Sequence, residues 1–199
     1  MAGKITADPS AKSELRRQII AARDALPPAA REASSAAITA QLLALDAYRS
    51  AARVLSYMSF GSEFDTAAFN ADVLANNKQL CLPRVDRTAR RLDIHIVENL
   101  ASDLHSGVWG IREPRADRPA ADMAAIDFVF LPGVAFTARC ERLGYGGGFY
   151  DRLIPRFMHR PALVAGAFGV QMCETVPCDA NDQRVDVVVT ENAFYCNCG

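Results

Sequence analysis

The sequence predicts a three-layer α/β fold with a mixed, mostly parallel sheet and a pair of helices at its N-terminus. Helix-like and strand-like segments alternate along most of the chain, two helical patterns precede the first strand pattern, and two strand patterns follow each other with no helix between them. The 199 residues suit one compact domain, and no repeat or flexible linker divides them. We therefore expect a single domain over residues 1–199.

Four helices are predicted from apolar residues at helical spacing. They cover residues 13–25, about 29–47, 65–77 and 149–158. The pair Pro27-Pro28 separates the first two because proline interrupts a helix, and Pro155 disturbs the last. Asp65 and Thr66 give the third a start signal.

Six strands are predicted from β-branched and aromatic runs or from alternation. They are RVLSYMSF (53–60), QLCLPRV (79–85), LDIHIVENL (92–100), the run within IDFVFLPGVAF that stops at Pro132-Gly133, ALVAGAF (162–168) and RVDVVVT (184–190). The second and third lie next to each other without a helix, which predicts an antiparallel pair or an edge hairpin. The fourth is apolar throughout, as a strand buried on both faces is.

Charge and composition argue against several classes of protein. The chain has 22 basic and 23 acidic side chains, and half of its residues are hydrophobic. This balance disfavours disorder and predicts no nucleic-acid partner. The N-terminus MAGKITADPSA lacks the apolar run of a signal peptide, and no segment is long and apolar enough to span a membrane. We expect a cytoplasmic protein without a membrane partner.

The segment RLGYGGGFYDR, residues 142–152, carries the strongest functional signal. Glycine reaches positive φ readily and has no Cβ, so backbone N–H groups at Gly146, Gly147 and Gly148 can converge on an anion. The helix that begins after them adds its positive N-terminal dipole. The segment matches neither the P-loop nor G-x-G-x-x-G, and a flexible turn is the alternative interpretation.

The residues around the glycines favour a phosphate site over a turn. Arg142 and Arg152 supply positive charge at both ends of the segment. Asp151 lies in the first helical turn, where a carboxylate can hold hydrated Mg²⁺. A phosphate group and its metal ion fit this chemistry.

This segment resembles the signature of the 5-formyltetrahydrofolate cyclo-ligase family, also called methenyltetrahydrofolate synthetase. Other parts of the chain resemble the family in the same order and spacing. They are Lys12 to Arg16, SFGSEFDT (59–66), CLPRV (81–85), WGIREP (109–114), FLPGVAF (130–136) and the pair Val185-Asp186. The resemblance covers nearly the whole chain, and the glycine segment is its most specific part.

The resemblance implies a reaction. Members of this family use ATP and Mg²⁺ to convert 5-formyltetrahydrofolate to 5,10-methenyltetrahydrofolate, with release of ADP and phosphate. The γ-phosphoryl group activates the formyl oxygen, a folate nitrogen closes the ring, and phosphate leaves. This chemistry requires positioning and charge neutralisation, which agrees with a sequence that has no convincing Ser-His-Asp or Cys-His pattern.

The resemblance also assigns residues to ligands. For ATP it implies Lys12, Arg16, Arg142, Gly144, Tyr145, Gly146, Gly147, Gly148 and Tyr150. For the folate, the residues expected are Met58, Phe60, Glu63, Trp109, Tyr145 and Phe149. Arg142 and Asp151 are the expected catalytic residues, and Asp151 and Asp186 the expected Mg²⁺ ligands.

Each assignment has a structural alternative. Lys12 and Arg16 share a helix face at a spacing of four, but such a face is often simply solvated. Glu63 precedes a helix and can complement its dipole instead of accepting hydrogen bonds from the amino-pyrimidine ring. Apolar residues such as Met58, Phe60 and Trp109 can wall a flat ligand or belong to the core.

The sequence leaves two other functions open. The scaffold can activate a different small substrate with ATP, since a fold does not fix chemistry, or it can bind a folate or nucleotide without catalysis. The family often has tyrosine at Phe149, and some members have a basic residue at Tyr145, so this chain lacks that hydroxyl and that cation. We expect 5-formyltetrahydrofolate and ATP as partners, and a monomer.

Overall fold

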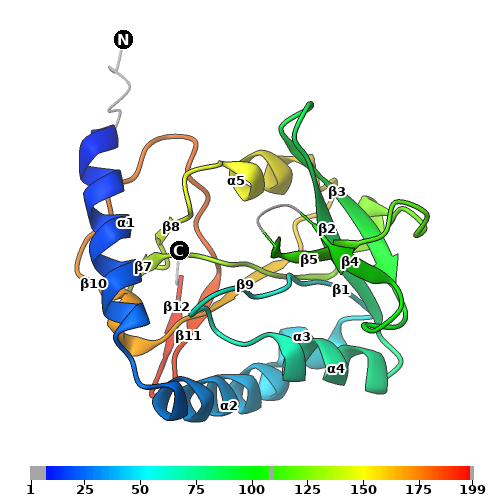
Figure 1. Cartoon of the computed structure of the whole chain (residues 1–199), viewed down its shortest axis with the longest axis horizontal. Coiled ribbons are helices and arrows are strands. Elements are labelled where there is room, and N and C mark those ends of the chain that lie inside the picture. Colours follow the sequence, from blue (N-terminus) through cyan, green and yellow to red (C-terminus); the bar gives the residue numbers. More distant parts are fainter. Residues whose placement is uncertain (1–7, 108–109, 198–199) are drawn as a thin grey trace.

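A computed structural model describes residues 8–107 and 110–197 and places a seven-stranded sheet at the centre of the molecule (Figure 1). The strand order is β12-β11-β9-β6-β1-β2-β3. The bounds are β1 Arg53–Leu55, β2 Gln79–Asp86, β3 Arg91–Val97, β6 Phe128–Phe130, β9 Ala162–Gly166, β11 Val187–Val189 and β12 Phe194–Cys196. Neighbours from β11 to β2 are parallel, and both edge pairs are antiparallel. The predicted mixed, mostly parallel sheet is confirmed.

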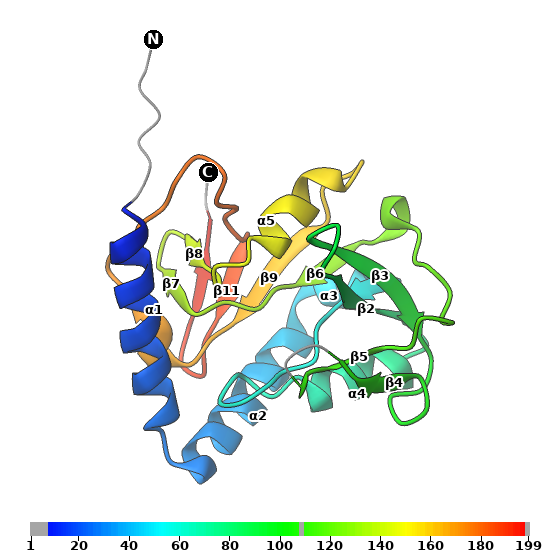
Figure 2. The same ribbon diagram turned by 45° about the horizontal axis from the view of Figure 1, so that its top comes forward.

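Helices cover both faces of this sheet (Figures 1 and 2). The α-helices are α1 Pro9–Asp24, α2 Pro28–Ala44, α3 Asp46–Ser50, α4 Ala67–Ala75 and α5 Phe149–Leu153. Short 3₁₀ turns are η2 Met123–Ala125, η3 Ile154–Arg156 and η4 Gly169–Gln171. Helices α2, α3 and α4 lie on one face and α5 on the other. The N-terminal helical pair is confirmed, but the second predicted helix is divided at Leu45, whose ψ of 131° is extended.

Two small sheets flank the large one. One has the order β10-β7-β8, with β7 Ala135–Thr137, β8 Arg142–Leu143 and β10 Met172–Cys173. The other pairs β4 Leu104–Ser106 with β5 Arg112–Pro114, and β5 lies against β2. Because β8 pairs antiparallel with β7, it delivers the glycine segment to the same side of the molecule as the end of β6.

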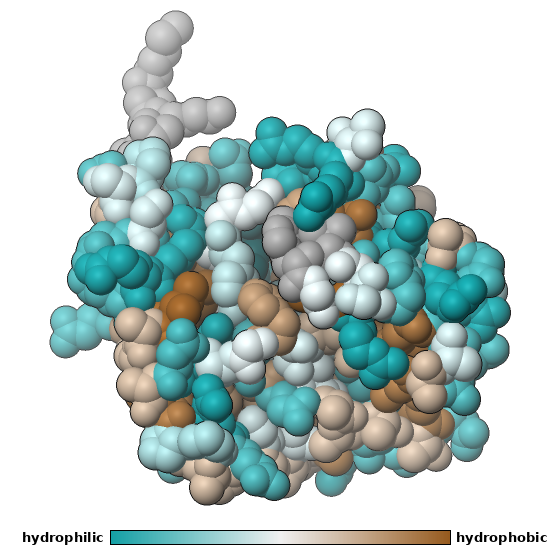
Figure 3. Space-filling view, viewed as in Figure 1, coloured by the Kyte–Doolittle hydropathy of each residue, from teal (hydrophilic) through white to brown (hydrophobic). Residues whose placement is uncertain are grey.

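Strand β6 explains why its sequence is apolar throughout. Phe128 and Phe130 point to the layer shared with α2 and α4, and Val129 and Leu131 point to the layer shared with α5. Alternate residues thus bury on opposite faces, as central parallel strands require. The face of the molecule shown in Figure 3 is mostly hydrophilic, with hydrophobic residues in separated patches. Among the described residues, no helix is long and apolar enough to cross a membrane.

Strand β1 is shorter than the predicted strand over residues 53–60. Beyond Leu55 the chain leaves the sheet, and side chains of the next helix region take up its backbone groups. The Tyr57 carbonyl accepts hydrogen bonds from Thr66 Oγ1 (2.9 Å) and Asn70 Nδ2 (3.0 Å). The prediction failed here because these polar side chains replace strand pairing. The resulting loop carries Met58, Phe60 and Glu63 to the end of the sheet.

Replacing Phe130 with alanine is expected to lower the free energy of unfolding by about 3–5 kcal/mol. The Phe130 side chain is fully buried and contacts the rings of Tyr57, Phe64 and Phe69. Urea denaturation would measure the change. Met158→Ala is the control, since Met158 is 81% exposed and its loss is expected to change stability by less than about 0.5 kcal/mol. Equal effects of the two changes would contradict the described core.

Candidate functional site

The glycine segment connects β8 to α5 and depends on left-handed backbone. Gly146 has φ +99° and Gly148 has φ +61°, values that favour glycine. Gly148 is also the N-cap of α5, so the predicted helix start after the glycines is confirmed. Within the described residues, the N–H groups of Gly146, Gly147 and Gly148 donate to no protein acceptor. Three backbone donors are therefore open to solvent or to a ligand.

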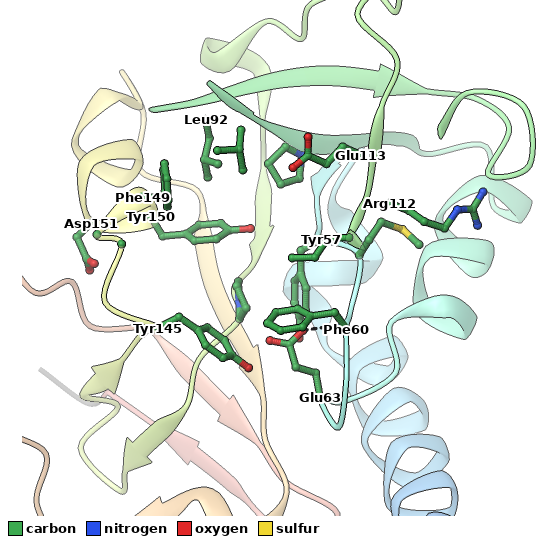
Figure 4. Close-up of a pocket in the computed structure, with 18 of the residues that line it drawn as sticks. Tyr57, Phe60, Glu63, Leu92, Arg112, Glu113, Tyr145, Phe149, Tyr150 and Asp151 are labelled. Carbon is green, nitrogen blue, oxygen red and sulfur yellow. Dashed lines mark hydrogen bonds between the residues drawn. The ribbon is translucent and has the colours of Figure 1, made fainter. Parts of the chain in front are cut away.

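An apolar cavity of about 410 Å³ lies on one side of this segment (Figure 4). Its walls come from the loop after β1, from β2 and β3, and from the glycine segment with α5. They include Tyr57, Met58, Phe60, Glu63, Pro83, Val85, Leu92, Tyr145, Phe149 and Tyr150. Predicted wall residues Met58 and Phe60 are thus at a cavity, while Trp109 lies outside the described residues. A mostly apolar slot with a few acids in its walls, among them Glu63, suits a flat heterocycle.

A charged cavity of about 910 Å³ lies on the other side of the segment. It is lined by α1, by the glycines and by the loop before β11. The charged residues are Lys12, Arg16, Asp151, Arg152, Asp179 and Asp182. Gly144, Gly148 and Asp151 line both cavities. The two cavities therefore meet at the glycine segment and the first turn of α5.

Glu63 is a buried acid in the lining of the apolar cavity. The Phe60 N–H donates to its Oε2 at 3.0 Å, and the Tyr145 hydroxyl lies beside its carboxylate. Burial raises the pKa of Glu63, while the bonds from Tyr145 and Phe60 and the charge of Arg23 act against this rise. Figure 4 shows the carboxylate between Phe60 and Tyr145. The predicted folate residues Glu63 and Tyr145 thus face each other.

Arg142 and Asp151 form an ion pair between the two cavities. Nη2 of Arg142 lies 2.6 Å from Oδ1 of Asp151, and the Arg142 side chain is only 2% exposed. Nη1 donates to the Pro132 carbonyl at 3.2 Å, and Oδ1 also accepts from the Gln183 N–H. Nε of Arg142 is buried without a hydrogen-bond partner in the described part of the chain. An unpaired buried donor calls for an explanation, and a ligand in the neighbouring cavity would supply one.

The two predicted cations of α1 both reach the charged cavity. Arg16 Nε donates to the Gly144 carbonyl at 2.8 Å. Lys12 Nζ lies 2.9 Å from Oδ2 of Asp179 and 2.5 Å from Oδ2 of Asp182. Burial lowers the pKa of Lys12, but the bonds to the two acids outweigh it and raise that pKa. The solvated-face interpretation is therefore wrong for Lys12, whose ammonium group is held by two acids.

Several predicted positions are arranged differently from the sequence expectation. Asp186 accepts from Arg160 at 2.5 Å and from the Leu163 N–H at 2.8 Å, and it lines neither cavity. It precedes β11, whereas the site lies where β1 and β6 end, so the geometry gives no support to its metal role. Four residues that were expected at ATP line the apolar cavity and not the charged one: Arg142, Tyr145, Gly147 and Tyr150.

Sequence reasoning missed three residues that the structure places at the site. Arg23 lies on the same face of α1 as Lys12 and Arg16, seven residues after Arg16, and this spacing was a usable signal. Asp179 and Asp182 lie in a loop that matches no motif. Only their tertiary contact with Lys12 reveals them.

Comparison with known proteins decides the family. The sequence profile of the 5-formyltetrahydrofolate cyclo-ligase family matches residues 8–191. The chain belongs to this family. A mouse 5-formyltetrahydrofolate cyclo-ligase is 28% identical over 195 residues, which is 92% of this chain and 95% of the relative. A relative from Arabidopsis thaliana with the same name, described as mitochondrial, is 29% identical over 206 residues, covering 90% of this chain and 73% of that protein.

A solved structure supports the same family. The NMR structure of the Aquifex aeolicus 5,10-methenyltetrahydrofolate synthetase matches with a TM-score of 0.83 and 32% identity, over 94% of this chain and 93% of that one. The cyclo-ligase fold and the fold described above are thus the same. The predicted family and the predicted α/β architecture are both confirmed.

Replacing Gly148 with alanine is expected to destabilise the site more than the same change at Gly61. Both residues have φ near +60°, so alanine introduces about 1–2 kcal/mol of backbone strain at each. A Cβ at Gly61 meets nothing within 4 Å, but one at Gly148 lies 2.8 Å from Arg152 Nη1. Arg152 must then shift, which disturbs its bonds to the carbonyls of Arg90 and Gly147. Urea denaturation measures how much stability each variant loses. Equal losses would show that the hydrogen bonds of Arg152 do not stabilise the site.

Proposed function

We propose that the protein is an ATP-dependent 5-formyltetrahydrofolate cyclo-ligase that produces 5,10-methenyltetrahydrofolate, ADP and phosphate. One observation carries the proposal beyond family membership. A mostly apolar cavity whose lining includes the buried Glu63 and a charged cavity with basic residues share Gly144, Gly148 and Asp151. A heterocycle and a nucleotide bound in these cavities would meet where a phosphoryl group has to pass between them.

The apolar cavity is the proposed folate site. The rings of Phe60 and Tyr145 lie 5.4 Å apart at its edge, and Met58 and Phe149 add apolar surface. The ionised Glu63 carboxylate offers two oxygens to N–H donors on the edge of a pterin. Binding is expected through these contacts, with the formyl group directed toward the glycine segment.

The charged cavity is the proposed ATP site. Lys12, Arg16 and Arg152 supply positive charge, and the open N–H groups of Gly146 and Gly148 supply backbone donors for phosphate oxygens. Helix α5 has only five residues, so its dipole adds less than the sequence suggested. Backbone amides and cations are therefore the main proposed contacts.

Asp151 suits a Mg²⁺ ion that accompanies ATP. Both hydrogen bonds described for its carboxylate use Oδ1, and the residue borders both cavities. No group of three or more His, Cys, Asp or Glu suited to a metal occurs among the described residues. One carboxylate together with phosphate oxygens and water is a common ligand set for Mg²⁺. When bound, the ion would neutralise developing charge on the phosphates.

The proposed chemistry needs no side-chain nucleophile. The formyl oxygen attacks the γ-phosphorus, ADP leaves, and the neighbouring folate nitrogen attacks the activated carbon before phosphate departs. The chain contributes orientation and fixed charge, with Arg142 and Asp151 as the proposed catalytic residues between the cavities. The apolar walls exclude water that would otherwise compete for the activated carbon.

Both cavities are built from residues of a single chain, so the proposal requires no partner subunit. We extend it to a monomer that acts in the cytoplasm as one domain. Light scattering after size-exclusion chromatography is expected to give the mass of one chain, 21.6 kDa.

The activity is tested directly with purified protein, ATP, Mg²⁺ and 5-formyltetrahydrofolate. Methenyl product should appear by absorbance together with an equal amount of ADP. Folded protein that gives no product would overturn the proposal. ATP turnover that ignores the folate would instead favour another substrate.

Asp151→Asn is expected to lower kcat on the order of 100-fold while folate binding changes little. Asparagine keeps an oxygen near Arg142 but removes the negative charge that suits Mg²⁺. Steady-state kinetics and equilibrium folate binding give the two quantities. Asp117→Asn is the matched control, because Asp117 is 71% exposed and lines neither cavity. Full activity of Asp151→Asn would exclude the proposed role.

A further inference from the structure

The fully buried side chains of helix α1 are both cations, and its described residues include no apolar side chain that is fully buried. Its buried residues are Lys12 and Arg23, and only 3% of Arg23 is exposed. A buried charge is expensive unless it is paired or well hydrogen-bonded. Lys12 has its two acids, but Arg23 takes part in none of the ion pairs of the described residues. The buried position of Arg23 thus needs another explanation.

The guanidinium group of Arg23 is bound by two hydroxyl groups. Nε donates to Ser62 Oγ at 3.0 Å, and Nη1 donates to the Tyr145 hydroxyl oxygen at 2.9 Å. The guanidinium carbon also lies 5.9 Å from the centre of the Tyr145 ring. Because the Tyr145 hydroxyl oxygen accepts a hydrogen bond from Arg23, the hydroxyl proton points away from Arg23.

The Tyr145 hydroxyl connects Arg23 to the acid of the apolar cavity. It lies beside the Glu63 carboxylate, and Figure 4 shows both groups at the same end of the cavity. Ser62, the other partner of Arg23, directly precedes Glu63 in the chain and donates to Asp24. Arg23 therefore holds, by hydrogen bonds, both Ser62 and Tyr145, the two residues next to the Glu63 carboxylate.

We propose that Arg23 is a positioning residue of the folate site, which holds the Tyr145 hydroxyl against Glu63 and keeps that buried carboxylate in its charged, hydrogen-bond-accepting form. The inference rests on the proposed function for its consequence in catalysis. Its structural part, the coupling of Arg23 to Glu63, does not depend on that function.

Among the described residues, Arg23 is the cation whose charge acts on Glu63, whereas Arg142 lies beyond Tyr150 and is paired with Asp151. The ionisable groups that face Glu63 from the packed elements are Arg23 from α1, Tyr57 after β1, Tyr145 from the glycine segment and Tyr150 from α5. Burial raises the pKa of all three tyrosines, so they are neutral near pH 7. Asp24 lies behind Ser62 and adds negative charge. Without Arg23, nothing positive in this group opposes protonation of Glu63.

Protonation of Glu63 would change what the cavity recognises. A carboxylate accepts hydrogen bonds through both oxygens, whereas a neutral acid places a donor against the N–H groups of an amino-pyrimidine. Loss of the Arg23 charge should therefore weaken folate binding, and more so as pH falls. ATP binding in the charged cavity should be unaffected, because Arg23 does not line it.

Kinetics of Arg23→Gln, Arg23→Lys and Tyr145→Phe test the inference. Arg23→Gln should raise the KM for the folate about tenfold and leave the KM for ATP within about twofold. The acid limb of kcat/KM for the folate should move up by about one pH unit. Arg23→Lys should restore much of the pH profile because it keeps the charge. Tyr145→Phe should raise the folate KM in the same way, because it removes the hydroxyl that joins the two groups.

Arg17→Gln is the matched control, since Arg17 is an exposed arginine of the same helix that pairs with Glu14. It should leave both KM values and the pH profile unchanged. A proportional loss of activity in Arg23→Gln at every pH, with both KM values raised alike, would mean that Arg23 is merely structural and would overturn the inference.

A measurement without turnover separates this inference from the proposed function. Carbon-13 NMR of glutamate-labelled protein follows the Glu63 carboxyl through a pH titration, with Glu63→Gln to assign the signal. The pKa of Glu63 should be about one unit higher in Arg23→Gln than in Arg23→Lys or the unaltered protein. An unchanged pKa would refute the coupling even in an active enzyme, and a shifted pKa would stand even if the protein formed no methenyl product.

Discussion

The site is organised around the buried ion pair between Arg142 and Asp151. The pair joins the end of β8 to the first turn of α5 at 2.6 Å, and the glycine segment spans the gap between these two residues. Breaking such a pair leaves an uncompensated buried charge, so the ends of the segment are strongly fixed. Glycines at positive φ then give the chain between them its curved path. The boundary between the two cavities follows from this one interaction.

Helix α1 depends on the same boundary as well as on a small apolar cluster, to which it contributes Leu15 and Ile19. Its inward face carries Lys12, Arg16 and Arg23, which reach in turn the acidic loop, the Gly144 carbonyl and the Tyr145 hydroxyl. An ordinary amphipathic helix buries an apolar stripe. Here much of the attachment is polar and directed at site residues, so the position of the helix and the geometry of both cavities are linked.

The sequence predicted the fold well because its signals are local. Apolar runs and helical spacing identified the central strands and most helices, and the β2–β3 pair followed from the missing helix. Local signals could not show that Thr66 and Asn70 would draw the backbone of Tyr57 out of the sheet. Where a motif existed, as at Gly144–Gly148, it identified residues that the structure places at the two cavities. Asp179, Asp182 and the bond between Arg23 and Tyr145 arise only from contacts between distant segments, and a motif alone could not show that Asp186 lines neither cavity.

Pairing of charges also explains how a chain of net charge −1 presents a site for a polyanion. Lys12 is neutralised by Asp179 and Asp182, and Arg142 by Asp151. Unpaired cations in an open cavity would attract any polyanion, including nucleic acid.

Cations that are already paired with carboxylates exchange those partners only for a ligand that brings phosphate oxygens to the same position. A nucleotide that arrives with its own cation meets this requirement, since its phosphates replace the carboxylates while its cation compensates the acids. Under the proposed function, selectivity for ATP over other polyanions therefore lies as much in the acids of the charged cavity as in its lysine and arginines.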